Sequence, residues 1–185
     1  MTLPVVALVG RPNVGKSTIF NRLVGERVSI IYDTPGVTRD RIYNETSYKN
    51  VRFNVIDTGG IDIAEGEFNK NIRVQVELAI DESDLVLFIV DGKEGITAND
   101  LVVRDMLRKS NKKVIVVINK IDNNANEENI YDFYELGFDT YLPVSGEHGR
   151  GFYELEDLPD WFPESHKQPV SGWSRYHAQN NGWHR

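Results

Sequence analysis

The chain of 185 residues contains no cysteine, which excludes disulfide scaffolds, thiolate metal sites and cysteine nucleophiles. It also lacks long hydrophobic runs. The longest uncharged apolar stretches, 85–90 and 114–118, fall far short of the roughly 20 residues that a membrane span requires. The first residues show neither a basic segment nor a signal-type cleavage site. We therefore expect a soluble protein of the cytoplasm that does not act at a membrane.

Positive charge is also scarce, because 21 lysines and arginines stand against 28 aspartates and glutamates and give a net charge of −7. This balance argues against a nucleic-acid footprint spread over the whole surface and leaves a local basic patch as the alternative, and we expect no direct DNA binding. We also expect a monomer. Hydrophobic residues are plentiful at 40%. Together with a length typical of one domain, they allow a sizeable hydrophobic core.

The segment 159–185 differs in composition from the rest of the chain. It holds all three tryptophans, three of the four histidines and three of the seven prolines, without a sustained helix or strand period. One interpretation is an aromatic–histidine ligand site, and the other is a disordered or non-native end. Histidines this widely spaced on an unstructured chain favour the second. We expect a folded domain at 1–158 and leave 159–185 out of the predicted fold.

Within residues 1–158, short apolar runs alternate with helical patterns. Strands are predicted at 4–9, 42–48, 51–56, 85–90, 114–118 and 141–144, and helices at 17–24, 69–80, 97–109 and 127–136. Thr97 and Asp100 form a predicted capping pair. Most of the runs are continuously apolar, as in a buried parallel sheet, whereas 42–48 alternates and pairs with 51–56 as an antiparallel edge hairpin. The prediction is an α/β fold with a six-stranded, mostly parallel sheet, one antiparallel edge strand and helices on both faces.

Ligands of such sheets bind at the carboxyl ends of the strands, so functional residues are expected in the turns that follow them. The turn after the first strand reads Gly10-Arg-Pro-Asn-Val-Gly15-Lys16-Ser17, a G-x-x-x-x-G-K-S run. Its glycines let backbone N–H groups face phosphate oxygens at a helix N-terminus. Lys16 is expected to reach the β- and γ-phosphates and the Ser17 hydroxyl to bind Mg²⁺. The alternative, a tight turn with an exposed lysine, is disfavoured by the strand–turn–helix context.

Two further strand ends carry polar motifs. Asp57-Thr-Gly-Gly60 follows 51–56, where the carboxylate is placed to hold Mg²⁺ through water and Gly60 lets the backbone approach the γ-phosphate. Asn119-Lys120-Ile121-Asp122 follows 114–118. A carboxylate at Asp122 accepts hydrogen bonds from N1–H and the N2 amino group of guanine and repels adenine. The second motif therefore predicts a guanine site.

Other residues of these loops complete the predicted site. Asn119 is placed to tie its loop to the phosphate loop, and the stem of Lys120 to cover the face of the base. Ser145-Gly146, a small-residue turn after 141–144, is expected to offer a backbone N–H to guanine O6.

In this order the motifs resemble those of the translation-factor-like P-loop GTPases, and among them the EngA/Der family of ribosome-assembly GTPases. The matching stretches are GRPNVGKST at 10–18, GVTRDR at 36–41, DTGGID at 57–62, NKID at 119–122, and YDFYELGF and PVSGEHGRG across 131–151. The resemblance covers about residues 3–158. It implies a P-loop GTPase fold, GTP hydrolysis to GDP with Mg²⁺, and a role in maturation of the large ribosomal subunit. Members normally carry a second GTPase domain and a KH-like domain, so this chain is similar to the first domain alone, with the ribosome contacted by the full-length protein.

The resemblance also implies roles for single residues. Thr38 resembles the switch threonine that meets Mg²⁺ with GTP bound, and Ile61 stands where many GTPases have a water-orienting glutamine. Asn13 matches an asparagine that holds K⁺ beside the phosphates in related GTPases, although a turn-forming role after Pro12 is the alternative. Catalytic roles are implied for Lys16, Asn13, Thr38 and Gly60, and metal ligands are Ser17, Thr38 and Asp57 for Mg²⁺ with Asn13 for K⁺. The implied nucleotide contacts are Gly10, Asn13, Val14, Gly15, Lys16, Ser17, Thr18, Asp57, Gly60, Asn119, Lys120, Asp122, Ser145 and Gly146.

Two alternatives to an active GTPase are considered at this point. The first is a nucleotide-binding signalling module whose hydrolysis is negligible in isolation, and it stays open. An adenine-nucleotide enzyme is disfavoured by Asp122, because its carboxylate has no donor to meet on the corresponding edge of adenine.

Overall fold

The computed structural model describes residues 3–24, 42–48, 51–57, 70–122, 128–155 and 162. Thr38, Gly60 and Ile61 lie outside the described residues, as do all three tryptophans. In the described ranges, none of the helices is both long and apolar enough to cross a membrane.

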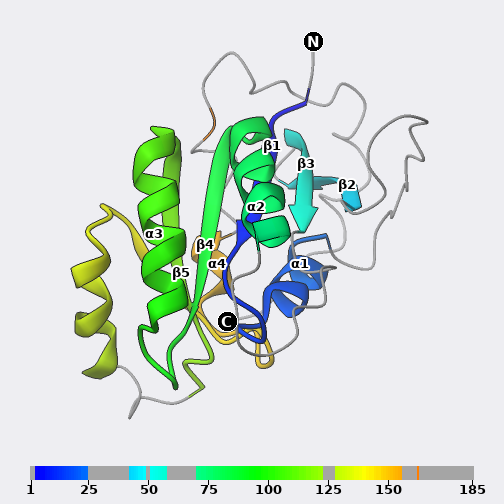
Figure 1. Ribbon diagram of the computed structural model, residues 1–185. Coiled ribbons are helices and arrows are strands. Elements are labelled where there is room, and N and C mark those ends of the chain that lie inside the picture. The colour runs from blue at the N-terminus through cyan, green and yellow to red at the C-terminus, as the bar shows by residue number, and fades with distance from the viewer. Residues whose placement is uncertain are drawn as a thin grey trace, which may run out of the picture.

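Six strands form one sheet in the order β2-β3-β1-β4-β5-β6 (Figure 1). Their bounds are β1 Val5–Val9, β2 Ile42–Tyr48, β3 Val51–Asp57, β4 Leu85–Asp91, β5 Lys113–Asn119 and β6 Tyr141–Pro143. β2 pairs antiparallel with β3 at one edge, and every other neighbouring pair is parallel. The predicted six-stranded sheet with one antiparallel edge strand is confirmed.

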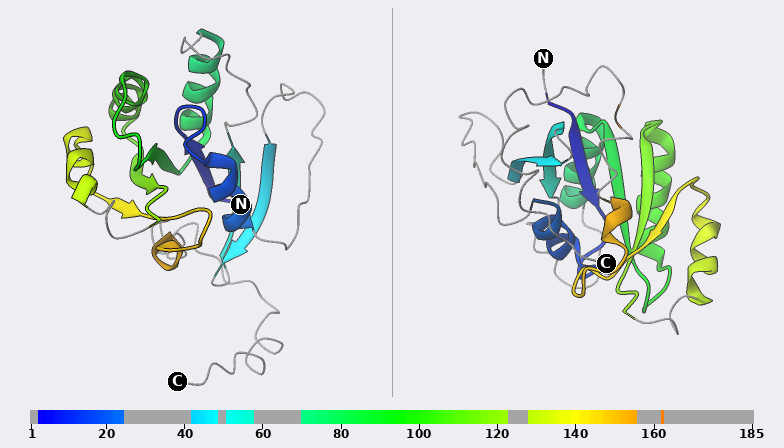
Figure 2. Two further views of the ribbon diagram at one scale, coloured as in Figure 1. Left: turned by 90° about the horizontal axis from the view of Figure 1, so that it is seen from below. Right: turned by 180° about the vertical axis from the view of Figure 1, so that it is seen from behind.

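Helices cover both faces of this sheet, as predicted. They are α1 Lys16–Val24, α2 Lys70–Glu82, α3 Ala98–Ser110, the short α4 Phe152–Leu155 and the 3₁₀ helix η3 Glu128–Leu136. α2 and α3 lie on the face turned to the viewer in Figure 1, and the view from behind in Figure 2 shows α1 and α4 on the other face.

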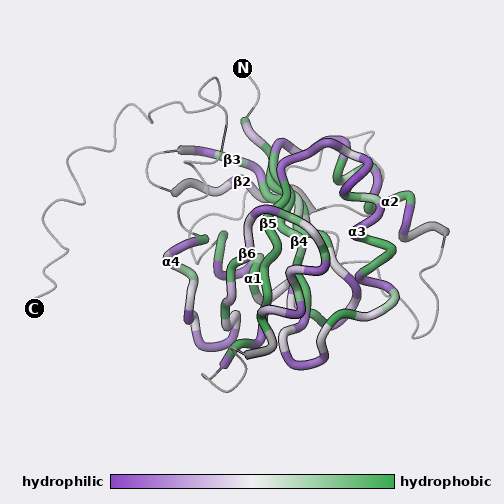
Figure 3. The backbone as a smooth tube through the Cα atoms, turned by 90° about the vertical axis from the view of Figure 1, so that its left-hand side faces the viewer, coloured by the Kyte–Doolittle hydropathy of each residue, from purple (hydrophilic) through white to green (hydrophobic). Residues whose placement is uncertain are grey.

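The core consists of two hydrophobic layers separated by the sheet. β4 is buried along its whole length, and its side chains alternate between the layers. Leu87 belongs to the layer that includes Ile19 of α1, whereas Phe88 belongs to the layer that includes Val103 of α3 and Phe133 of η3. Figure 3 shows the resulting hydrophobic centre of the tube at β4 and β5. Continuous apolar strands are therefore explained by helices on both sides.

The segment 128–136 is a 3₁₀ helix, although the amphipathic pattern at 127–136 suggests an ordinary helix. Its apolar residues Ile130, Phe133 and Leu136 are spaced by three. With 3.0 residues per turn, a 3₁₀ helix places side chains at that spacing in one line. Phe133 and Leu136 are accordingly buried in the layer shared with α3. Gly137 ends the helix at a φ of 71°, a left-handed conformation that favours glycine.

The start of α3 has the predicted capping box. The backbone N–H of Asp100 donates to the Thr97 hydroxyl, and the Asp100 carboxylate accepts from the Thr97 backbone N–H at 2.9 Å. The backbone N–H groups in the first turn of a helix have no partner within the helix. Because these two bonds satisfy N–H groups at the start of α3, they fix where the helix begins.

One residue of the segment 159–185 is described, and it lies in the core. Phe162 is 3% exposed and belongs to the same layer as Ile19. Its ring centroid is 5.6 Å from that of Phe53 on β3. The domain boundary at 158 stays a prediction, and at least one side chain beyond it contributes to the fold.

Candidate nucleotide site

The predicted motifs meet at one edge of the sheet. The register of the parallel strands sets Asp57 level with Leu8, just before the phosphate loop, and Asp91 level with Asn119. Since the carboxyl ends of parallel strands share an edge, the loops after β1, β3, β4, β5 and β6 all leave from it. Side chains far apart in the sequence can therefore surround one ligand.

The phosphate loop, residues 10–15, depends on glycine at both ends. A Cβ on Gly10 would overlap the carbonyl oxygen of Ile89, and one on Gly15 would overlap the amide nitrogen of Asn119. Gly15 also has a φ of 95°, which favours glycine. Asn13 adopts a φ of 64°, a conformation that asparagine tolerates better than most residues. The loop is thus shaped by its backbone and fitted closely to the ends of β4 and β5.

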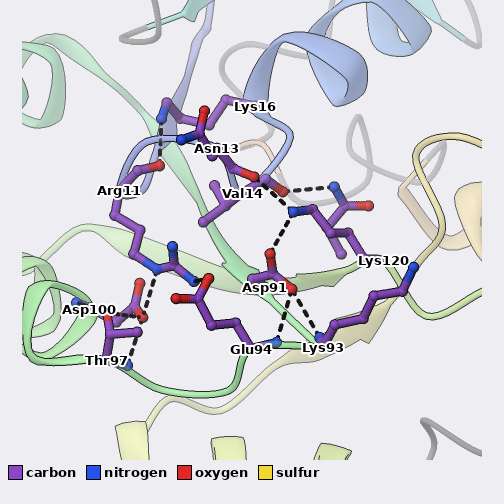
Figure 4. A network of polar contacts seen from close by, with 11 residues as sticks. Arg11, Asn13, Val14, Lys16, Asp91, Lys93, Glu94, Thr97, Asp100 and Lys120 are labelled. Carbon is purple, nitrogen blue, oxygen red and sulfur yellow. Dashed lines mark hydrogen bonds and ion pairs between the residues drawn. The ribbon is translucent and has the colours of Figure 1, made fainter. Parts of the chain in front are cut away.

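Lys16 is held inside this loop. Its side chain is largely buried, and its Nζ donates to the carbonyl oxygen of Gly10 at 3.0 Å and to that of Arg11 at 2.8 Å. Figure 4 shows the contact with Arg11. These acceptors are uncharged, whereas phosphate oxygens carry full charge and bind an ammonium group more strongly. Lys16 is therefore positioned where an exchange of carbonyl for phosphate oxygens would favour the ligand.

Asn119 joins the phosphate loop to the loop after β6. Its Nδ2 donates to the carbonyl oxygen of Val14 at 2.8 Å, and its Oδ1 accepts from the backbone N–H of Gly146 at 2.9 Å. The side chain is buried, so both bonds are shielded from water. The predicted tie between Asn119 and the phosphate loop is confirmed. The bond to Gly146 is an addition that the sequence did not indicate.

Lys120 makes a second link to the phosphate loop. Its Nζ donates to the carbonyl oxygen of Asn13 at 2.8 Å and to Asp91 Oδ2 at 2.5 Å. Burial raises the pKa of Asp91, but the hydrogen bond from Lys120 and the backbone N–H groups of Lys93 and Glu94 outweigh it and hold the pKa below its usual range. Asp91 is thus an ionised anchor for Lys120 (Figure 4). That the stem of Lys120 covers a base stays a prediction.

Asp122, the predicted guanine reader, has partners on both oxygens. The hydroxyl of Ser145 donates to Oδ1 at 2.7 Å, and Nζ of Lys93 lies 2.5 Å from Oδ2. The hydrogen bonds from Lys93 and then Ser145 lower the pKa of Asp122. Asp122 is therefore held as a carboxylate, which is the form that guanine requires.

The loop after β6 uses its own backbone donors. The N–H of Ser145 donates to the carbonyl oxygen of Arg150 at 2.9 Å, and the N–H of Gly146 donates to Asn119. A contact from Gly146 to guanine O6 would have to share the bond to Asn119. Ser145 contributes through its hydroxyl, which orients Asp122.

Arg22 of α1 binds the same loop, the one after β6, through two backbone carbonyl oxygens. Its guanidinium donates from Nε to the carbonyl oxygen of Gly146 and from Nη2 to that of Glu147 at 2.6 Å. It also lies over the ring of Phe152, 5.6 Å from the centroid, where a cation is attracted by the aromatic face. The helix that begins at Lys16 therefore also supports the base end of the site, which consists of the loop after β6 and the motif 119–122.

Arg11 ties the phosphate loop to α3. Its Nε lies 3.3 Å from Asp100 Oδ2 and its Nη2 2.7 Å from Glu94 Oε2 (Figure 4). Arg11 and Asp100 are both buried, so this pair is little screened by solvent. Asp100 thus serves the capping box and the phosphate loop together.

Sequence reasoning missed Arg11, Arg22, Asp91, Lys93 and the second role of Asp100. For Asp91 a signal existed, because it ends a buried strand as Asp57 and Asn119 do. No local pattern marks Arg11 or Arg22, whose partners are distant in the chain.

The donor set fits Mg²⁺ in part. Ser17 is exposed in the first turn of α1, and Asp57 ends β3 level with the start of the phosphate loop. Their oxygens are the hard ligands that Mg²⁺ prefers. The described ranges contain no cluster of three or more histidines and carboxylates that would hold a metal without help. This suits Mg²⁺ at a nucleotide, which takes few protein ligands beside phosphates and water.

Comparisons with known proteins agree with this geometry. A family model described as "50S ribosome-binding GTPase" matches residues 5–120. The GTPase Der of Staphylococcus carnosus (strain TM300) is 57% identical over 157 residues, which make up 85% of this chain and 36% of that protein. The chain thus spans little more than a third of the length of the curated relatives it matches.

Solved structures show the same fold. Era from Aquifex aeolicus bound to GDP·AlF4⁻ has a TM-score of 0.70 and 30% identity, covering 92% of this chain and 60% of Era. Era in complex with MgGDPNP and a segment of 16S ribosomal RNA has a TM-score of 0.71 and 31% identity, covering 92% and 59%.

Proposed function

Because the chain belongs to the family of 50S ribosome-binding GTPases, we propose that it binds GTP and hydrolyses it to GDP and phosphate. The observation that carries this proposal is the double contact of Asn119 with Val14 and Gly146. One buried side chain sets the distance between the phosphate loop and the loop beside Asp122. A ligand with phosphates at one end and a guanine base at the other matches that arrangement.

Asp122 supplies the base selectivity. Its carboxylate, whose pKa the hydrogen bonds from Lys93 and Ser145 lower, is oriented by Ser145 and would accept hydrogen bonds from N1–H and the N2 amino group of guanine. Adenine has an acceptor at N1 and no amino group at C2, so the carboxylate would meet a repulsive edge. The site therefore favours GTP over ATP.

At the phosphate end, the N–H groups of the phosphate loop and Lys16 would hold the β- and γ-phosphates. Ser17, Asp57 and Thr38 would hold Mg²⁺, with Thr38 outside the described residues. When bound, Mg²⁺ neutralises charge on the β- and γ-oxygens. Gly60, also outside the described residues, is proposed to approach the γ-phosphate through its backbone.

Potassium is the proposed second cation, held by Asn13 in the exposed turn of the phosphate loop. A potassium ion there would add positive charge beside the β–γ bridge, where negative charge develops during hydrolysis. The backbone of Asn13 is left-handed and its carbonyl oxygen accepts from Lys120, so we assign K⁺ to the oxygen of the side-chain amide.

The test is GTP turnover by the chain in K⁺ buffer and in Na⁺ buffer of equal ionic strength. We expect faster turnover in K⁺, and Asn13→Ala should remove the difference while GDP affinity changes little. Equal, near-zero rates in both buffers, with GDP still bound, would favour the alternative of a nucleotide-binding signalling module. Tight ATP binding in competition with GTP would contradict the guanine assignment.

We further propose that the nucleotide state gates a cytoplasmic role in assembly of the large ribosomal subunit. The family description, which names the 50S subunit, and the Der relatives support this. The structure of Era with MgGDPNP and 16S ribosomal RNA, an RNA of the small subunit, supports only the more general link between a guanine nucleotide and ribosomal RNA. Because the chain is acidic, with a net charge of −7, ribosome binding should depend on the longer protein to which such domains belong. Cosedimentation of the full-length protein with 50S subunits, in GDP against a GTP analogue, measures this.

A further inference from the structure

The end of β4 and the loop that joins it to α3, residues 91–97, contact two of the nucleotide motifs, the phosphate loop and 119–122, although no nucleotide motif lies within them. Asp91 binds Lys120, Glu94 binds Arg11 of the phosphate loop, and Lys93 binds Asp122. The first two contacts support the shape of the site. The third is different, because it occupies the group that is proposed to recognise the base.

The backbone of Lys93 is bound to Asp91, and its side chain extends from there to Asp122. Its N–H donates to Asp91 Oδ1 at 2.9 Å, and the next N–H, of Glu94, donates to the same oxygen at 3.1 Å. In Figure 4 the Lys93 side chain points away from Asp91. Its ammonium group lies 2.5 Å from Asp122 Oδ2, with 54% of the Lys93 side chain exposed and 20% of that of Asp122. Only rotation of this side chain is needed to make or break the contact.

Guanine recognition draws on the same carboxylate. A carboxylate offers about four acceptor sites on its two oxygens, so Ser145, Lys93 and the two donors of guanine together would need every one of them around a single group. On Asp122, Ser145 takes one at Oδ1 and Lys93 takes one at Oδ2, while a guanine edge presents two donors in one plane, one for each oxygen. Ser145 is fully buried and fixed, whereas Lys93 is half exposed. The partner that yields to the base is therefore Lys93.

We propose that Lys93 competes with the guanine base for Asp122 and thereby lowers guanine-nucleotide affinity and speeds nucleotide exchange. This inference rests on the proposed guanine site and names a residue that tunes it. The competing pair is partly exposed, and such pairs contribute little free energy, so the effect on affinity is modest. A small effect is sufficient to shorten the residence time of GDP after hydrolysis.

The test compares Lys93→Gln with the unsubstituted chain by titration of a fluorescent GDP and by its dissociation rate. We expect the Kd to fall about threefold in Lys93→Gln, with slower dissociation, because the ion pair that the base must displace is gone. The gain should shrink as ionic strength rises from about 0.05 to about 0.5 M, where charge interactions at exposed sites are screened. The matched control is Lys109→Gln, which removes an exposed lysine in the last turn of α3 and should leave the Kd unchanged.

A double-mutant cycle separates the contact from the general effect of removing a positive charge. In the Asp122→Asn background the amide matches the edge of xanthine, so the fluorescent ligand there is XDP. If Lys93 acts through Asp122, adding Lys93→Gln in this background should not tighten XDP binding.

Three results would overturn the inference. They are an unchanged or higher Kd for GDP in Lys93→Gln, an equal gain in Lys109→Gln, or an equal gain for XDP in the Asp122→Asn background. Failure of the proposed function is a separate result, because then the unsubstituted chain would bind GDP and ADP alike and Asp122→Asn would not shift preference to XDP.

Discussion

The base end of the candidate site is held together by side chains that contact each other and distant backbone, whereas the phosphate end is a backbone loop around one lysine. Asn119, Asp122 and Ser145 each bridge two loops, and two of the three are buried. At the phosphate end, Lys16 donates to carbonyl oxygens of its own loop. The side chains expected to recognise the base bridge different loops, whereas Lys16 contacts carbonyl oxygens of its own loop, which Arg11, Asn119 and Lys120 in turn link to the rest of the fold.

This difference separates two ways of preparing a site for a ligand. The partners of Asn119 need not change when a nucleotide binds. Folding has already ordered this side chain, so its ordering does not reduce the free energy of binding. Lys16 has to exchange carbonyl oxygens for phosphate oxygens. We therefore expect substitution of Asn119 to affect stability and binding together, and substitution of Lys16 to affect mainly binding.

The largest effect should come from Lys16→Ala. Loss of the ammonium group removes a charge-assisted contact to phosphate, and we expect the Kd for GDP to rise about a thousandfold, or about 4 kcal/mol. Lys112 is a matched control, because its Nζ also donates to two carbonyl oxygens, of Asp81 at 2.9 Å and Ser83 at 2.7 Å. Lys112→Ala should leave GDP binding intact. A similar loss of binding in both variants would mean that Lys16 acts only on the fold.

Asn119→Ala should come next and should change two quantities at once. It leaves the Val14 carbonyl and the Gly146 N–H without their buried partner, so we expect the free energy of unfolding to fall by about 2–3 kcal/mol. The Kd for GDP should rise about a hundredfold, because the two loops lose their fixed spacing. Urea unfolding and GDP titration measure the two effects. If binding weakens without loss of stability, the contrast between the two ends is wrong.

Arg11→Gln tests the ion pair that links the phosphate loop to α3. It leaves the carboxylate of Asp100 buried without its charged partner, and we expect the free energy of unfolding to fall by about 2 kcal/mol. Adding Asp100→Asn should recover part of that loss, because the uncompensated charge is then removed. Equal losses in the single and double variants, measured by urea unfolding, would show that the pair is not coupled.

The smallest effect is the pH dependence at Asp91. Its pKa in the folded protein lies below the unfolded value, so ionised Asp91 stabilises the fold fully above about pH 4, and this contribution is lost as the pH falls through the folded-state pKa. Asp91→Asn should lower the free energy of unfolding by about 1 kcal/mol at neutral pH, and the difference should vanish in acid. A difference that grows as the pH falls would contradict the assignment of Asp91 as the anchor of Lys120.

The sequence predicted the fold and the site to different depths. Strand bounds agree within a residue because continuous apolar runs have few other ways to be buried, and Asn119 could be tied to the phosphate loop because both belong to recognisable motifs. Lys93 and Arg11 could not be placed, because their partners depend on how loops lie in space. The 3₁₀ helix at 128–136 was missed because apolar spacing of three is also part of an ordinary amphipathic pattern.

The two ends of the site share one rigid spacer. α1 begins at Lys16, and Arg22, later on the same helix, grips the carbonyl oxygens of the loop at the base end. With a rise of 1.5 Å per residue, these two positions are about 9 Å apart along the helix axis. α1 therefore fixes the distance between the phosphate loop and the loop after β6, together with Asn119, which joins the same two loops. The site thus selects a ligand by its length as well as by its charge and hydrogen bonding.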